Sequence, residues 1–96
     1  MSSANIDAIQ ARYKASFSEK KMMIDGYRSQ LLDESNNLSH LYEEIHGELH
    51  KLAGSLGMYG YDDLAVQARL AMRLSLTQEK ESLDESLERL SLLFVE

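Results

Sequence analysis

The stretch NLSHLYEEIHGELHKLAGSLGM, residues 37–58, decides the fold of this chain. Its apolar side chains recur every three or four residues, the spacing that places them on one face of an α-helix. They are Leu38, Leu41, Tyr42, Ile45, Leu49, Leu52, Ala53 and Leu56. At about 100° per residue they lie within about 65° of one direction, so we expect a long helix that buries this face. Gly60 follows and is suited to ending the helix in a left-handed conformation.

The residues before this stretch predict a second long helical region. Apolar residues three, four or seven apart extend over about 5–32, as one helix face requires. Gly26 or the polar stretch 16–21 could break this region into two helices. In the turn that follows, Ser35 or Asn36 is placed to cap the next helix.

Two shorter helices are expected after Gly60. Asp62 or Asp63 can cap the first, and Thr77 can cap the second. The predicted inner faces are Leu64, Ala68, Ala71 and either Met72 or Ser75 in the first helix, and Leu83, Leu87, Leu90 and Phe94 in the second. Four striped helices with short connections predict an all-α antiparallel four-helix bundle, with an extra N-terminal helix if the first region breaks.

Composition narrows the functional classes. The 96 residues suit one domain over 1–96, and 44% are hydrophobic, enough for one shared core. The absence of cysteine rules out disulfides, thiolate metal ligands and a cysteine nucleophile. A net charge of −6 without a basic stripe argues against nucleic-acid binding. The sequence contains no run of about 20 apolar residues, so it does not predict a membrane span. The first residues lack the features of a signal peptide, so we expect a cytoplasmic protein.

His50 is the residue that points to a function. It lies about 100° around the helix from Leu49, which marks the centre of the apolar face, so its ring is expected to face solvent. The residues on the same side are Glu43, Gly47, Gly54 and Gly57. Each helical glycine costs up to about 1 kcal/mol relative to alanine. We interpret these glycines as a clearing that lets another protein's active site close over the imidazole.

An exposed neutral histidine is a nucleophile through a ring nitrogen and can attack an acyl-phosphate. The attacking nitrogen must be unprotonated, and an acceptor on the other nitrogen would orient the ring. Lys51 lies beside His50 in the sequence and could contribute charge to phosphoryl oxygens, although it points about 100° further around the helix.

The segment 50–60 resembles the signature of histidine-containing phosphotransfer (HPt) domains. That signature has a histidine, an apolar residue two positions later, glycine at four, a small residue at five and glycine at ten. The matching residues are His50, Leu52, Gly54, Ser55 and Gly60. The motif covers about a dozen residues, whereas the expected bundle matches the family over essentially the whole chain.

The resemblance implies a phosphorelay protein of a two-component signalling system. His50 would accept a phosphoryl group from a receiver-domain aspartate, on the ring nitrogen remote from the backbone, and pass it to another receiver. The partners would be response-regulator receiver domains and a sensor or hybrid histidine kinase. The receiver would supply Mg²⁺, so this chain would need no cofactor and have no turnover of its own. We expect a monomer, and Met1 favours a free-standing chain.

The resemblance also assigns neighbouring roles. Gly54 would be the small residue beneath the ring that permits docking. Many members have lysine three residues after the histidine, where this chain has Ala53. Many orient the imidazole with a polar side chain of the following helix, for which Gln67 is the candidate.

Two alternatives remain from the sequence. The first is a helical adaptor that docks on a receiver or kinase without carrying phosphate, although such an adaptor would not need His50. The second is a metal-binding helical protein that uses Glu43, His46 and His50, since histidines four residues apart can hold zinc. Against it, Gly47 stands where the HExxH pattern requires glutamate. The sequence contains no glycine-rich phosphate loop, so nucleotide binding is not expected.

Overall fold

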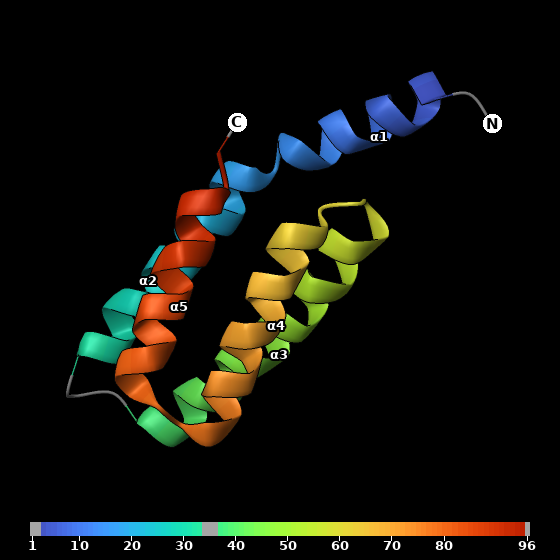
Figure 1. Cartoon of the computed structure of the whole chain (residues 1–96). Helices are drawn as coiled ribbons and strands as arrows, with labels where there is room; N and C mark the ends of the chain where they lie inside the picture. Colours follow the sequence, from blue (N-terminus) through green and yellow to red (C-terminus); the bar gives the residue numbers. More distant parts are fainter. Residues whose placement is uncertain (1–2, 34–36, 96) are drawn as a thin grey trace.

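The computed structural model describes residues 3–33 and 37–95, and their side chains from residue 8 onward. In this part of the chain it has five helices and no strand: α1 (Ser3–Lys14), α2 (Phe17–Leu32), α3 (Leu38–Met58), α4 (Asp62–Thr77) and α5 (Lys80–Leu93). Helix α3 packs on α4, α4 on α5, α5 on α2, and α2 on α3, which closes a four-helix bundle. Helix α1 projects beyond the end of the bundle at which α3 joins α4 (Figure 1). The prediction of an all-α helical bundle is confirmed.

The N-terminal helical region is broken, but at Ala15 and Ser16 rather than at Gly26. The Ser16 hydroxyl donates to the carbonyl of Tyr13 at 2.6 Å, a local hydrogen bond that competes with continuation of the helix. The break therefore falls at the start of the predicted polar stretch 16–21, whereas Gly26 is an ordinary helical residue of α2.

The N-terminus of α3 is capped by Asn37, whose side-chain oxygen accepts a hydrogen bond from the backbone N–H of His40 at 3.3 Å. The predicted caps Ser35 and Asn36 lie outside the described residues. Because Asn37 satisfies one of the free N–H groups of the first turn, α3 can begin at Leu38.

The predicted caps of the last two helices are wrong. Asp62 and Asp63 lie inside the first turn of α4, where the helix dipole favours acidic side chains. Thr77 is the last residue of α4, because Gln78 takes a left-handed conformation (φ 56°) that ends the helix. The residue before α5 is Glu79, which makes no side-chain cap hydrogen bond.

The core is built from the predicted apolar faces of the bundle helices. The fully or almost fully buried side chains are Phe17, Ile24, Tyr27 and Leu31 from α2, Leu41, Tyr42, Ile45, Leu49, Leu52, Ala53 and Leu56 from α3, Ala65, Ala68, Ala71 and Ser75 from α4, Leu83, Ser86, Leu87, Leu90 and Ser91 from α5, and Phe94 just after it. Leu38, Leu64 and Met72 are only partly buried. The small residues of α4 allow its backbone to lie close to α3, which fixes the exposed face of α3.

The turn between α3 and α4 also holds α1. Gly60 has a φ of +85°, as predicted for the helix terminator. From α1, the Gln10 side-chain amide donates to the carbonyl of Tyr59 at 2.9 Å. The Tyr13 hydroxyl lies 2.7 Å from the Ser55 hydroxyl, and its ring stacks on Tyr59 with centroids 4.4 Å apart. These contacts attach α1 to the end of α3.

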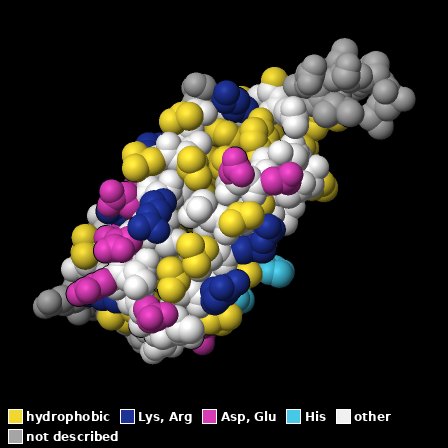
Figure 2. Space-filling model, in the orientation of Figure 1, with side chains coloured by type: hydrophobic (Ala, Val, Ile, Leu, Met, Phe, Trp, Pro, Cys, Tyr) yellow, Lys and Arg dark blue, Asp and Glu magenta, His cyan; other side chains and the backbone are white. Residues whose placement is uncertain are grey.

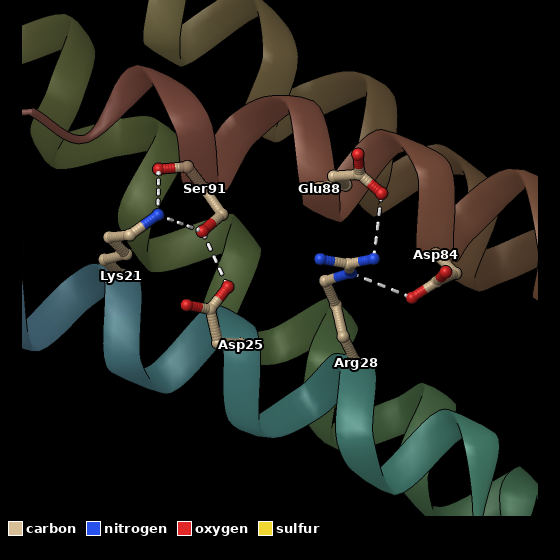
Figure 3. A network of polar contacts seen from close by, with 6 residues as sticks. All are labelled: Lys21, Asp25, Arg28, Asp84, Glu88 and Ser91. Atoms are coloured by element: carbon tan, nitrogen blue, oxygen red, sulfur yellow. Dashed lines mark hydrogen bonds and ion pairs between the residues drawn. The ribbon is translucent and has the colours of Figure 1, made fainter.

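Polar contacts join α2 to α5 along their shared edge (Figure 3). Arg28 bonds to Asp84 at 3.0 Å and to Glu88 at 2.9 Å. Lys21, two turns before Arg28 in α2, donates to the Ser91 hydroxyl at 2.9 Å. That hydroxyl donates to Asp25, one turn before Arg28, at 2.6 Å. Within residues 3–33 and 37–95, no helix is long and apolar enough to cross a membrane.

Candidate functional site

His50 lies away from both ends of α3, on the side of the helix that faces solvent. Its neighbour Leu49 has no exposed surface, whereas His50 itself is exposed. Histidine side chains stand out at the molecular surface with lysine or arginine side chains close by (Figure 2). Within the described residues, neither ring nitrogen of His50 takes part in a hydrogen bond, so the ring is open to a partner from solvent.

Three glycines lie on the face of α3 that carries His50, one before it and two after it. A Cβ atom built on Gly47, Gly54 or Gly57 would meet no atom within 4 Å. None of the three has a positive φ, so no backbone conformation requires glycine there. Packing inside this chain therefore does not explain the glycines, each of which makes α3 less stable than alanine would. We call Gly47, Gly54 and Gly57 the glycine strip.

Lys51 is a solvated charge at the edge of this surface. Its side chain is 76% exposed, and its ammonium nitrogen lies 3.6 Å from a carboxylate oxygen of Glu48 one turn earlier. An ion pair this exposed contributes little to stability, so Lys51 can exchange Glu48 for another anion at little cost.

His46, which the sequence offered only as a candidate metal ligand, lies beside His50 on α3. The two imidazole rings are almost parallel, with an interplanar angle of 17° and centroids 6.4 Å apart. His46 is half-buried and shares a shallow hollow with Glu43, Tyr42 and residues of α4. The spacing of four residues was the available signal for this pair.

The structure gives the metal alternative no support. In the part of the chain whose side chains are described, no three histidine, aspartate or glutamate residues are grouped so that they could hold a metal ion. The parallel rings of His46 and His50 are brought together, but Glu43 does not complete a site with them.

Gln67 does not act on His50 in this structure. Its side-chain oxygen is buried on α4 and accepts no hydrogen bond from any described residue. No hydrogen bond joins it to the imidazole, so the predicted orienting contact is not formed. Gln67 does lie on the helix that follows α3 in the sequence, and this helix, α4, packs on α3.

Comparison with known proteins finds no match among protein-family models, curated proteins or solved structures. The candidate site consists of an exposed histidine, the glycine strip on the same face of α3, and one lysine and one histidine beside it.

Proposed function

We propose that this chain is an HPt-like phosphorelay protein in which His50 carries a phosphoryl group between receiver-domain aspartates. The observation that supports it most is the glycine strip, which leaves three positions on the face of an exposed imidazole without side chains. Each glycine lowers the stability of the helix, and no contact among the described residues requires glycine there. A docking partner that must approach His50 closely accounts for that cost.

The chemistry needs only a neutral imidazole from this chain. A ring nitrogen of His50 attacks the phosphorus of an aspartyl phosphate, so that an N–P bond forms and the P–O bond to the aspartate breaks. The aspartate leaves as a carboxylate, and the proton on the other ring nitrogen passes to solvent. The partner receiver supplies the aspartate and a Mg²⁺ ion that offsets the charge on the phosphoryl oxygens. Because the second receiver reverses the same step, the chain is a carrier and not an enzyme.

Lys51 supplies the positive charge that many HPt domains place three residues after the histidine. That position is Ala53 here, and it is 6% exposed, at the edge of the core. Lys51 is exposed and held only by Glu48, so it is free to turn toward the phosphoryl oxygens when a partner docks.

The other features of the proposal follow from this role. The bundle is antiparallel and forms a single domain over residues 1–96. The protein acts as a monomer in the cytoplasm, with receiver domains and a sensor or hybrid histidine kinase as partners. It needs no cofactor of its own, no nucleic acid and no membrane.

The direct test is phosphoryl transfer from a panel of phosphorylated receiver domains. We expect the wild-type chain to take up label that is stable in base and labile in acid. His50→Gln should take up none, while His40→Gln, which removes another exposed histidine of α3, should label normally. Equal labelling of His50→Gln would refute the assignment of the site.

The adaptor alternative predicts a different outcome of the same experiment. A chain that only docks would bind a receiver without taking label, and its affinity would be unchanged in His50→Gln. Binding without labelling across the whole panel would therefore overturn the phosphorelay proposal and favour the adaptor.

A further inference from the structure

Two arginines of α4, Arg69 and Arg73, are exposed on the helix that packs against α3. We infer that Arg69 binds the oxygens of the phosphoryl group at His50 from this neighbouring helix, and that Arg73 adds to the positive charge around them. This inference rests on the proposed function, because it names a residue that holds the phosphoryl group at the same histidine.

The position of Arg69 along α4 is close to the level of His50 along α3. His46 of α3 and Leu76 of α4 line the same hollow, and the opposite ends of the two helices are joined by the short turn 59–61. Because both helices rise by about 1.5 Å per residue, residues whose numbers sum to about 120 lie side by side. Arg69 and Arg73 therefore both lie within about one helical turn of the level of His50.

The rotation of the helices places Arg69 on the side of α4 that adjoins α3. Leu76 marks that side, because it lines the hollow that also contains His46. At about 100° per residue, Arg69 lies about 20° around α4 from Leu76, and Arg73 about 60°. His50 lies about 40° around α3 from His46. The exposed edges of α3 and α4 thus bring an arginine and the histidine to one surface, and Figure 2 shows lysine or arginine side chains directly beside the histidine side chains.

Neither arginine has a carboxylate partner in the part of the chain that the structure describes, where the ion pairs are those of Arg28 and Lys51. No acidic residue stands three or four positions from Arg69 or Arg73 in the sequence. The two arginines are four residues apart, and like charges at this spacing repel each other and destabilise a helix. An anion bound between them and His50 accounts for this arrangement.

The carboxylates on this side of the two helices lie toward its ends. Glu43 comes seven residues before His50 in α3, and Asp62 comes seven residues before Arg69 in α4. Each separation is about 10 Å along the helix axis. The middle of the surface therefore carries the arginines, and it attracts a dianionic phosphoryl group.

Lys51 lies on the other side of His50, away from α4. It is about 140° around α3 from His46, which marks the side adjoining α4. Its ammonium nitrogen lies 3.6 Å from a carboxylate oxygen of Glu48, which offsets part of its charge. Arg69 has no such partner, so it is the cation that can bind the phosphoryl oxygens without first giving up an ion pair.

Arginine suits this role because its guanidinium stays charged and presents two parallel N–H donors to two phosphoryl oxygens. The oxygens remain negative while the phosphoryl group moves from its donor to the ring nitrogen of His50. A cation held beside them stabilises the transition state and the phosphohistidine. Arg69 touches the phosphoryl oxygens and neither gains nor loses a proton.

The experiment phosphorylates His50 with phosphoramidate, which needs no partner protein. The ring nitrogen bonds to phosphorus, the P–N bond of phosphoramidate breaks, and ammonia leaves. The phosphohistidine signal in ³¹P NMR measures the rate, and its absence in His50→Gln identifies the site. We expect Arg69→Gln to slow this reaction by about tenfold or more, because a charge-assisted hydrogen bond to the phosphoryl group is lost. Arg73→Gln should slow it less.

Three further measurements separate phosphoryl binding from a structural role. Arg89→Gln removes an exposed arginine of α5 that forms no ion pair among the described residues, and it should react at the wild-type rate. Arg69→Lys keeps the charge but not the paired donors, so it should recover part of the rate. Thermal melts should find Arg69→Gln at least as stable as the wild type, because the repulsion from Arg73 is removed.

The inference is overturned if Arg69→Gln reacts with phosphoramidate at the wild-type rate, or if Arg89→Gln is slowed equally. Normal reaction with phosphoramidate combined with slow transfer from a receiver would also overturn it, because Arg69 would then contact the partner and not the phosphoryl group. Failure of the proposed function gives a different result: the wild type reacts with phosphoramidate but with no receiver domain, and the effect of Arg69→Gln is still measured. A wild type that reacts with neither donor refutes both.

Discussion

Leu49 and His50 are adjacent in α3 but have opposite environments: Leu49 has no exposed surface, and His50 is exposed to solvent. One helix therefore supplies both the centre of the core and the candidate site. Since the buried face of α3 fixes the rotation of the helix, it also fixes the direction in which His50 leaves the bundle. The position of His50 on the surface is therefore set by the packing of α3.

Gly54→Ala should separate stability from phosphoryl transfer. A Cβ atom at Gly54 meets nothing within 4 Å, so alanine should raise the free energy of unfolding by about 0.5–1 kcal/mol through its higher helix propensity. If the glycine strip is a docking surface, the same methyl group should slow transfer from a receiver about tenfold, because overpacking a well-packed contact costs about 1–3 kcal/mol. Urea denaturation measures the change in stability, and a time course of phosphoryl transfer measures the change in rate.

Gly26→Ala is the matched control for this substitution. Gly26 lies in α2, where a Cβ atom also meets nothing within 4 Å. It should produce a similar gain in stability with no change in transfer rate. If Gly54→Ala transfers as fast as Gly26→Ala, the glycine strip is not a docking surface.

Gly60→Ala should destabilise the protein, in contrast to the helical glycines. Gly60 has a φ of +85°, and a Cβ atom there would lie 3.0 Å from the side-chain nitrogen of Gln10. The backbone strain should lower the free energy of unfolding by about 1 kcal/mol or more. Gly47→Ala, in open space on α3, serves as the comparison and should be neutral or stabilising in the same thermal melt. Equal melting temperatures would contradict the left-handed turn.

The sequence was sufficient for the faces of the helices and for the end of α3 at Gly60, but not for the N-caps of α4 and α5. The apolar spacing in α3 predicts its buried face, because apolar side chains on one side of a helix are the ones that packing removes from water. The caps depend on the backbone conformation that the chain takes in its turns, which distant contacts influence. Tyr61, for example, occupies the N-cap position of α4 while its ring packs against Tyr13 and Phe17. No local pattern around Asp62 contains that information.

The candidate site divides in the same way. Helical geometry was enough to place His50 and the glycine strip on one exposed surface. The parallel rings of His46 and His50 depend on side-chain rotamers, which residue spacing does not determine. The buried oxygen of Gln67 likewise depends on how α4 rotates against α3.

The ion pairs of Arg28 should contribute measurably to the contact between α2 and α5. Arg28 and Asp84 are about three-quarters buried, with exposed side-chain fractions of 28% and 22%. Arg28→Ala should lower the free energy of unfolding by about 1 kcal/mol, because the remaining carboxylates lose a partner that is partly shielded from water. Arg89→Ala, on the exposed side of α5 and in no ion pair among the described residues, should change it by less than about 0.5 kcal/mol.

A double-mutant cycle with Asp84→Asn tests whether the pair itself carries this effect. The cost of Arg28→Ala should shrink when Asp84 is already asparagine, and both costs should fall in high salt. Purely additive costs would show that Arg28 stabilises the bundle through its second ion pair, with Glu88, or through the packing of its aliphatic stem.

The stability of the bundle should fall in strong base because of Tyr27. Burial, followed by the charges of Glu44 and Glu48, raises the pKa of Tyr27 to about 12. In the unfolded chain its phenol titrates near the ordinary value of about 10. Between these values the unfolded state loses a proton that the folded state retains. Stability from this group is therefore complete below about pH 10 and is lost as the pH rises toward about 12.

Tyr27→Phe isolates that contribution, because phenylalanine keeps the buried ring and removes the titrating hydroxyl. The wild type should lose on the order of 1–2 kcal/mol of unfolding free energy more than Tyr27→Phe between about pH 10 and pH 12. Urea denaturation at several pH values measures the difference, and Tyr59→Phe, on a partly exposed tyrosine at the end of α3, controls for general effects of base. Parallel pH profiles for wild type and Tyr27→Phe would mean that the Tyr27 hydroxyl reaches solvent more freely than its 7% exposure indicates.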